Sequence, residues 1–207
     1  MTAELKASAV VAAIGLVLAG AACGVDSPAE TNYATRIETA RRAKDEAWKQ
    51  ENAPPIPKER KADFLPLLYY PVDPSYEVPA ELKPSAETPT MTMPTSTGEM
   101  RPMRRVGQLQ FSLKGQPFKL TAFVEAGAPD VSHLFVPFKD LTSGMDTYEA
   151  GRYLDLDRNA TGLYNLDFNL AYTPNCHFSP MYSCPIPPKE NHLPIEIKAG
   201  EKVKTAS

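Results

Sequence analysis

From Phe64 onward the chain alternates short β-type runs with turn residues, and this pattern limits the possible folds more than any other feature. In each run apolar and polar side chains alternate, or β-branched and aromatic residues gather, and Gly, Pro or Asp ends it. The runs are 76–82, 90–93, 100–113, 117–125, 132–138, 148–155, 163–172 and 193–199. Because the connections are too short for helical crossovers, neighbouring strands should pair antiparallel. We expect a mainly β (α+β) domain, an antiparallel barrel or sandwich of about eight strands.

The turn residues and the size of the chain agree with this fold class. "SLKGQPF" places Lys114 and Gly115 between two runs, which predicts a tight hairpin. The 21 prolines fit turns, edge strands and extended linkers. A length of 207 residues with 43% apolar composition is enough for one domain with a real core.

One amphipathic helix should precede the β-type runs. Apolar residues recur at helical spacing up to about Gln50, and charged residues fill the other side. The apolar positions are Ala29, Tyr33, Ile37, Ala40, Ala47 and Trp48. The prolines of the segment 52–61 then end the helix. We expect the apolar stripe to pack against the rest of the fold, with binding of a partner protein as the alternative.

The first residues are typical of an export signal. Lys6 precedes a run of small and apolar residues that ends in "LAGAAC" at Cys23, which resembles the bacterial lipoprotein box. We therefore expect a signal peptide at 1–22, lipidation of Cys23, and a location on the extracytoplasmic face of a cell-envelope membrane. An ordinary signal peptide or an uncleaved anchor is the alternative. The tether, helix and linker would occupy 23–62, and the β-rich domain 63–207.

Charge and motifs exclude several classes of function. The net charge of −3 comes from interspersed charges with no basic stripe, which argues against nucleic acid as a partner. Glycine-rich phosphate loops, nucleophile elbows and His-Glu-x-x-His signatures are absent from the sequence. We therefore predict no cofactor and no metal site.

The run 163–172 carries an unusual polar face. Asn165, Asp167 and Asn169 alternate with large apolar residues, although Asn and Asp are depleted in strands. Such a face can line a polar ligand cavity, form a buried hydrogen-bond network or lie in solvent. An aspartate there could also act as a general acid or base.

Just upstream, Arg152, Tyr153 and Asp155 lie on the preceding run. An arginine in this place could hold a carboxylate or phosphate group, or pair with Asp167 across the hairpin. We predict a ligand-binding surface formed by Arg152, Tyr153, Asp155, Asp167 and Asn169.

Two cysteines follow in "TPNCHFSPMYSCP". If Cys23 carries lipid, Cys176 and Cys184 remain as an even pair in an oxidising compartment, which favours a disulfide. A zinc site with His177 and His192, or free thiols with packing or redox roles, is the alternative.

Four long motifs resemble one known family. They are "LLYYPVDPSY", "LFVPFKDLTSGMDTYEAGRYLDL", "LDFNLAYTPNC" and "CPIPPKENHLPIEIKAGEK". Together they are similar to the uncharacterised bacterial family called domain of unknown function 1684, over about 41–202. The resemblance implies no particular reaction, substrate or cofactor. The family pattern marks Arg152, Tyr153, Asp155, Asp167, Asn169, Tyr172, Cys176, Cys184 and Asn191, and does not mark His177.

The sequence therefore leads to one functional hypothesis with two rivals. The first is an exported, membrane-tethered β-rich domain that binds a small polar ligand. The rivals are an envelope structural or interaction module whose protein partner is unknown, and a hydrolase-like enzyme that uses Asp167.

Overall fold

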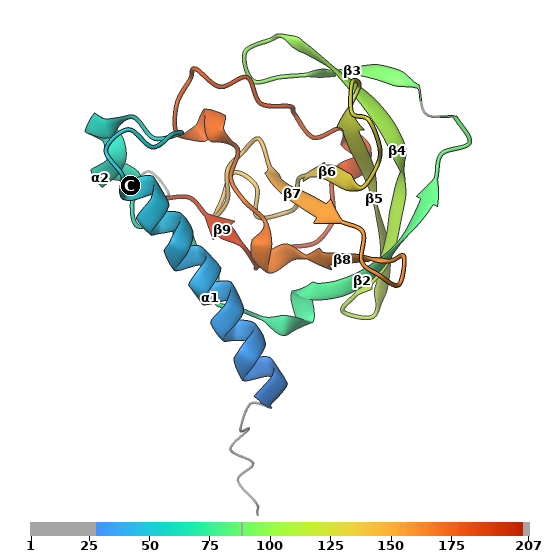
Figure 1. The fold of residues 1–207 in the computed structure, drawn as a ribbon, viewed down its shortest axis with the longest axis horizontal. Coiled ribbons are helices and arrows are strands. Elements are labelled where there is room, and N and C mark those ends of the chain that lie inside the picture. The colour runs from blue at the N-terminus through green and yellow to red at the C-terminus, as the bar shows by residue number, and fades with distance from the viewer. Residues whose placement is uncertain (1–27, 88, 205–207) are drawn as a thin grey trace, which may run out of the picture.

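The structure is a computed structural model that describes residues 28–87 and 89–204 of the chain. It is built around one antiparallel sheet that curls into a nearly closed barrel, with a long helix across one flank (Figure 1). The predicted fold class is therefore confirmed. The predicted signal peptide and Cys23 lie outside the described residues.

The barrel and its extensions contain nine strands in the described part of the chain. They are β1 (Leu68–Tyr69), β2 (Glu77–Pro84), β3 (Thr90–Pro94), β4 (Met100–Leu113), β5 (Gln116–Glu125), β6 (His133–Phe138), β7 (Arg152–Asp157), β8 (Tyr164–Asp167) and β9 (Glu201–Lys202). The helices are α1 (Pro28–Lys49) and α2 (Lys61–Phe64), with short 3-10 turns η1 (Lys58–Arg60), η2 (Pro74–Tyr76), η3 (Phe168–Leu170), η4 (Asn175–His177) and η5 (Lys189–Asn191).

The sheet closes on itself almost completely. Its strand order is β7-β6-β5-β4-β2-β8, and β3 adds to β4. The two end strands, β7 and β8, are consecutive in the chain, and the isolated bridges Arg158–Tyr164 and Tyr153–Tyr172 lie between them. Strands β1 and β9 form a separate two-stranded pair.

The predicted hairpin joins β4 to β5. Lys114 has φ 51° and Gly115 has φ 76°, so both central residues adopt the left-handed conformation that a tight type I′ turn requires. A register shift between Arg105 and Gly107 then bends β4. A side chain at Gly107 would meet the Lys83 carbonyl oxygen at 2.3 Å, so only glycine allows β2 to approach so closely here.

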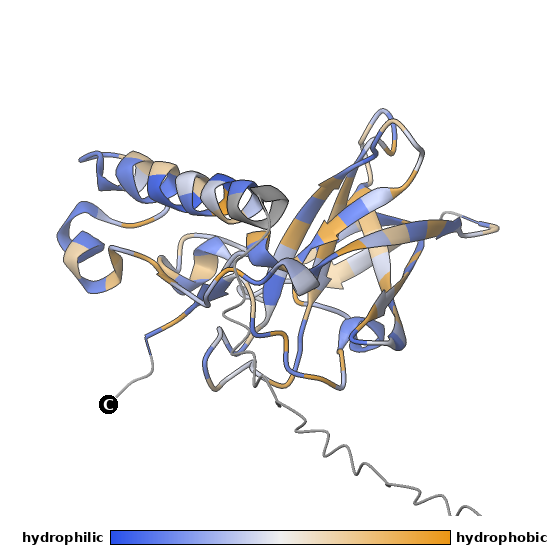
Figure 2. Ribbon diagram, turned by 90° about the horizontal axis from the view of Figure 1, so that it is seen from below, coloured by the Kyte–Doolittle hydropathy of each residue, from blue (hydrophilic) through white to orange (hydrophobic). Residues whose placement is uncertain are grey.

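The main core lies on one face of the curled sheet. Alternate residues of β4 to β8 are buried there, and Phe168 contacts Phe111 and Phe138 at ring-centroid distances of 5.8 and 5.4 Å. In Figure 2 the strands alternate hydrophobic and hydrophilic colours, as expected for strands with one face in a core.

Helix α1 confirms the predicted element, but its contacts with the barrel are more polar than predicted. Tyr33 and Ile37 are buried, whereas Ala40 and Ala47 are exposed. Arg41 donates from Nη1 to the Tyr70 carbonyl at 2.9 Å, farther along the same face. Figure 2 shows a largely hydrophilic helix lying against the barrel. Long basic side chains can cover apolar surface with their stems, which explains why this face needs few apolar residues.

The last turn of α1 contacts two other segments. Lys44 pairs with Glu201 of β9, and the Trp48 ring lies 5.2 Å from that of Phe178. Neither this helix nor the others formed by residues 28–87 and 89–204 has the length and apolarity needed to cross a membrane.

The Arg152 side chain fixes the C-terminal segment, residues 193–202, to the barrel. It is 0% exposed, and its Nη2 donates to Asp140 Oδ2 and to the Ile197 carbonyl, both at 2.8 Å. Its Nη1 donates to the carbonyls of Ala199 and Glu201. One buried cation therefore binds one carboxylate and three backbone acceptors.

The structure corrects two strand predictions. The run 193–199 is not a strand, because the carbonyls of Ile197 and Ala199 accept from Arg152 and not from a neighbouring strand. The run 163–172 is a strand only to Asp167. The Asp167 carboxylate accepts from the Asn169 amide and starts η3, a local bond that competes with the sheet.

The buried ion pair gives a stability prediction. Asp140→Asn keeps the shape of the side chain but leaves the Arg152 charge without its counter-ion. We expect the free energy of unfolding in urea to fall by about 3 to 5 kcal/mol, as for other buried pairs that lose one partner. The control is Glu81→Gln, which breaks the exposed pair with Lys83 and should change little. Equal effects of the two substitutions would contradict the role given to Arg152.

Candidate functional site

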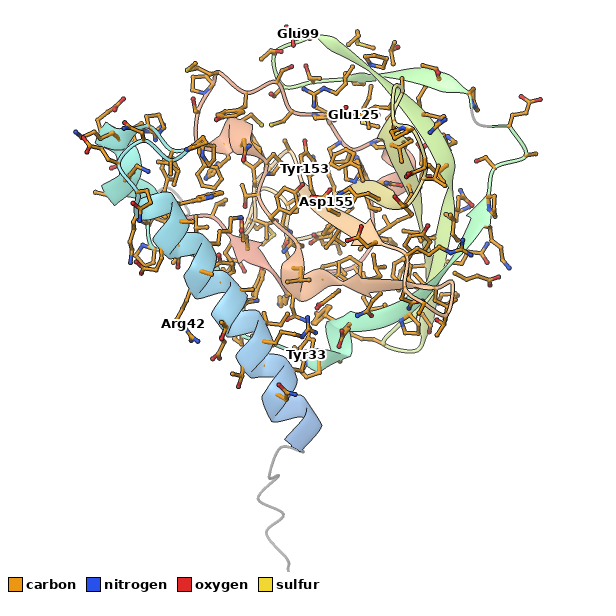
Figure 3. The ribbon with its side chains drawn as sticks, in the orientation of Figure 1. Tyr33, Arg42, Glu99, Glu125, Tyr153 and Asp155 are labelled. Atoms are coloured by element: carbon orange, nitrogen blue, oxygen red, sulfur yellow. The ribbon has the colours of Figure 1, made fainter. Side chains whose placement is uncertain are left out.

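The five residues predicted to bind a ligand lie in three different places. Arg152 is buried beneath the C-terminal segment, and Asp167 and Asn169 lie beneath α1. Tyr153 and Asp155 line a pocket. Figure 3 shows these two over the middle of the barrel, whereas Tyr33 of helix α1 lies away from them at the edge of the molecule.

The prediction of one common surface is therefore corrected. Consecutive residues of a strand face opposite sides, so Arg152 and Leu154 enter the core while Tyr153 and Asp155 face away from it. The predicted alternative, an ion pair between Arg152 and Asp167, is not formed, because Arg152 pairs with Asp140.

Asp167 and Asn169 form a buried hydrogen-bond network with helix α1. Tyr33 Oη donates to Asp167 Oδ1 at 2.9 Å, and Asn169 Nδ2 donates to Tyr33 Oη at 2.9 Å and to the Asp73 carbonyl at 2.8 Å. Asn169 Oδ1 accepts from the Asp73 amide at 3.0 Å. Of the alternatives for this polar face, the structure shows the buried network for these two residues. Asn165 instead lies exposed and donates to Glu77.

This network offers little room for catalysis. Asp167 is 3% exposed, and it lines neither the pocket that contains Tyr153 and Asp155 nor the hollow beside Tyr148 and His177. Burial raises the pKa of its carboxyl, although hydrogen bonds from Tyr33 and Asn169 act in the opposite direction. Its Oδ2 has no partner among the described residues. Asp167 thus holds α1 through Oδ1 and carries an energetic cost at Oδ2.

The pocket lies on the face of β6 and β7 that points away from the main core. Its volume is about 840 Å³, large enough for a small organic ligand. Strands β4 to β7 supply one wall, and the segment 181–185 supplies the other. The lining side chains include Arg101, Met103, Glu125, Asp130, His133, Phe135, Tyr153, Asp155, Tyr172, Asn175 and Tyr182.

Aromatic side chains form the base of this pocket. The rings of Phe135 and Tyr153 meet edge to face with centroids 4.8 Å apart, and Tyr153 meets Tyr172 at 5.7 Å. Tyr153 is 5% exposed, and its hydroxyl donates to the Pro185 carbonyl. Burial raises the pKa of Tyr153 far above its ordinary value, so the phenol stays neutral. The base of the pocket is thus rigid and uncharged.

Carboxylates lie around the aromatic base. Asp155 Oδ2 accepts from Tyr172 Oη at 2.8 Å, and its Oδ1 lies 4.0 Å from His133 Nε2. The hydrogen bond to Asp157 raises the pKa of His133. Glu125 is exposed, and its carboxylate has no hydrogen-bond or ion-pair partner among the described residues. Figure 3 shows Glu125 on the same side of the barrel as Tyr153 and Asp155.

The one arginine of the pocket is already engaged. Arg101 Nη2 donates to the Ser183 carbonyl at 2.6 Å and so holds the segment 181–185. The pocket therefore has three carboxylates, Glu125, Asp130 and Asp155, and one guanidinium that is partly satisfied.

The two cysteines lie beside this pocket as free thiols. Cys184 Sγ accepts from the Cys176 amide at 3.2 Å, and Cys184 lines the pocket. The predicted disulfide is not present in the structure. No three His, Cys, Asp or Glu side chains of residues 28–87 and 89–204 are placed to hold a metal ion. His177 instead contacts the rings of Phe64, Tyr148 and Phe178.

Three pocket residues, Arg101, Glu125 and His133, are not among those predicted from the sequence. His133 could have been found from the alternation of β6, since His133 and Phe135 share one face and Leu134 and Val136 the other. Arg101 and Glu125 lie on β4 and β5, and the pairing of β4, β5 and β6 in one curled sheet brings them to the pocket.

Comparison with known proteins identifies the family. A family model described as "Protein of unknown function (DUF1684)" matches residues 62–202. The chain belongs to this family. The DUF1684 region covers the β-rich domain and begins after helix α1.

A solved structure supports the fold of this DUF1684 chain. It is the solution NMR structure of the uncharacterized protein from gene locus rrnAC0354 of Haloarcula marismortui, to which the chain is similar at 35% identity. The match covers 84% of this chain and 96% of that chain, with a TM-score of 0.65. No curated protein matches the chain significantly. These comparisons show the family and the fold, and assign no activity.

Asp167 leads to a prediction about pH. Its carboxyl has a raised pKa in the folded protein, whereas the ordinary value is 3.8. As the pH falls, the folded protein takes up this proton before the unfolded chain does, which favours folding until the unfolded carboxyl also titrates near 3.8. Asp167→Asn removes this titration. The free energy of unfolding of the wild type, relative to the variant, should therefore rise between pH 7 and pH 4.

Urea denaturation of both proteins across this range measures the difference, and the other carboxyl groups cancel from it. A difference in the free energy of unfolding that stays constant, or that becomes smaller as the pH is lowered from 7 to 4, would contradict the raised pKa.

Proposed function

We propose that this protein is exported, is anchored to the envelope membrane through a lipid on Cys23, and binds a small polar ligand in the pocket beside β6 and β7. The ligand that the pocket favours is an organic cation with an apolar or aromatic part. The lipoprotein-like sequence at Cys23 supports the anchor. The observation that carries the binding role is the gathering of unpaired or weakly paired carboxylates over an aromatic base.

Charge supports a cationic ligand over an anionic one. The Glu125 carboxylate has no partner in the described part of the chain, and one oxygen of Asp155 has only a 4.0 Å contact with His133. Arg101, the cation that could hold an anionic ligand, already donates to the Ser183 carbonyl. A bound ammonium group would therefore find free acceptors, whereas a bound carboxylate would meet repulsion.

The aromatic base supports the same class of ligand. Faces of Tyr and Phe rings attract cations, and their area buries the apolar part of a ligand. Phe135, Tyr153 and Tyr172 are locked by mutual ring contacts and by the hydrogen bonds of the two tyrosines. A base that is ordered before binding loses little conformational entropy when the ligand arrives.

This proposal is tested with two probes of similar size and opposite charge, 2-phenylethylammonium and 3-phenylpropionate. At about five times its Kd the cation should stabilise the protein by about 1 kcal/mol and raise Tm by about 2 to 4 °C. Differential scanning fluorimetry measures the shift. The anion should give a much smaller shift.

Glu125→Gln and Asp155→Asn should each reduce the shift caused by the cation by at least half. Glu99→Gln is the matched control, because Glu99 is exposed and lies outside the pocket (Figure 3). Equal shifts for both probes, or unchanged shifts in both pocket variants, would show that the pocket does not select cations.

A further inference from the structure

Two cysteines on separate anchored segments meet beside the pocket. Cys176 lies in η4, and Cys184 directly precedes Pro185, which bridges to Thr95. The Cys184 amide donates to Ser96 Oγ at 3.1 Å, and the Ser96 amide donates to the Cys184 carbonyl at 2.9 Å. The hydrogen bonds of the surrounding backbone therefore hold the two thiols close to each other.

The surroundings of the two sulfur atoms differ. Cys176 Sγ lies 3.9 Å from Tyr148 Oη, which can donate to it. Cys184 Sγ accepts from the Cys176 amide and is buried at 8% exposure, whereas Cys176 is half-buried. One hydroxyl donor thus lies beside Cys176, which is also the more exposed of the two residues.

From this geometry we infer that Cys176 and Cys184 form a reactive dithiol, in which the Cys176 thiolate attacks a hydroperoxide or disulfide and Cys184 resolves the product. The attacking sulfur belongs to the more exposed residue, which has the Tyr148 hydroxyl beside it. The sulfur that resolves is its buried neighbour on the pocket wall. This role is independent of the ligand proposed for the pocket.

The electrostatics of the pair agree with these roles. The hydrogen bond from Cys184 lowers the pKa of the Cys176 thiol to about 6, against the effect of burial, and Ser96 and Tyr148 act in the same direction as Cys184. The hydrogen bond to Cys176, followed by burial, raises the pKa of the Cys184 thiol. A thiolate at neutral pH is the reactive form of cysteine.

The other groups around the pair do not oppose this assignment. The Arg101 guanidinium lowers the pKa of the Cys184 thiol only slightly, and the Tyr153 and Tyr172 phenols stay neutral because burial raises their pKa values. His177 is next to Cys176 in the chain, and its pKa is lowered by burial, so it adds no positive charge at neutral pH. Burial and then Cys176 raise the pKa of the Tyr148 phenol to about 12, and Glu149 acts in the same direction, so this phenol remains a donor.

With hydrogen peroxide as oxidant, the reaction balances in two steps. The Cys176 thiolate attacks one peroxide oxygen, the O–O bond breaks, and the leaving hydroxide takes a proton to form water, which gives a sulfenic acid. Cys184 then attacks the Cys176 sulfur, an S–S bond forms, and the S–O bond breaks to release a second water that carries the Cys184 proton. Two electrons pass from the dithiol to the peroxide, and an external thiol can return them.

Alkylation of the reduced full-length protein tests the assignment of the two sulfur atoms. Iodoacetamide labelling between pH 4 and pH 9, read by peptide mass spectrometry, should modify Cys176 with a half-maximal rate near pH 6 and Cys184 much more slowly. Cys184→Ala should move the Cys176 midpoint upward by more than one pH unit, and Tyr148→Phe should move it upward by less. Tyr182→Phe is the matched control and should leave it unchanged, since Tyr182 Oη has no hydrogen bond to either thiol.

Hydrogen peroxide should convert the wild type to the Cys176–Cys184 disulfide, and reduced glutathione should reverse this. Cys184→Ala should stop at a sulfenic acid on Cys176 that dimedone traps. The inference is overturned if Cys176 reacts at pH 6.5 no faster than free glutathione, or if peroxide leaves both thiols intact. A disulfide that millimolar glutathione cannot reduce would also overturn it, and would make the pair a permanent clasp.

Discussion

The buried guanidinium of Arg152 is the interaction on which the rest of the structure depends. It neutralises Asp140 and binds three backbone carbonyls of the C-terminal segment, which has no regular secondary structure up to β9. A segment without a strand ladder needs another partner for its polar backbone groups when it is buried. Arg152 provides it, and β9 can then pair with β1 and receive Lys44 of helix α1 through Glu201.

A second set of polar residues acts in the same way elsewhere. Asn191 is fully buried, and its side chain accepts from the Thr121 amide and donates to the carbonyls of Thr121 and Pro137. Asp167 and Asn169 hold Tyr33 of α1. Several positions that the family resemblance marks are therefore polar residues that complete the fold. A polar residue in the pattern of a family can reflect burial of backbone groups as readily as chemistry.

The fold class followed from the sequence because it depends on local signals. Alternation and turn residues predicted the β4–β5 hairpin and most of the strands, and helical spacing predicted the end of α1 to within a residue or two. The site did not follow, because the alternation of the run 163–172 was extrapolated past Asp167, where a side chain bonds to the backbone and ends the strand. Arg152 lies on the core face of β7, where it pairs with Asp140 and is out of reach of a ligand in the pocket. Its neighbours Tyr153 and Asp155, on the other face, do line the pocket.

The polar residues beneath α1 and the C-terminal segment thus have a structural role, and the proposed binding pocket lies apart from them on the other face of β6 and β7. Mapping of ¹H–¹⁵N chemical shifts during titration with 2-phenylethylammonium tests this separation most directly. The account predicts that the amide signals of Glu125, His133, Asp155 and Ser183 move with one common Kd, while those of Tyr33, Asp167 and Asn169 stay in place. Shifts centred on Tyr33 and Asp167, or no shifts at saturating probe, would contradict it.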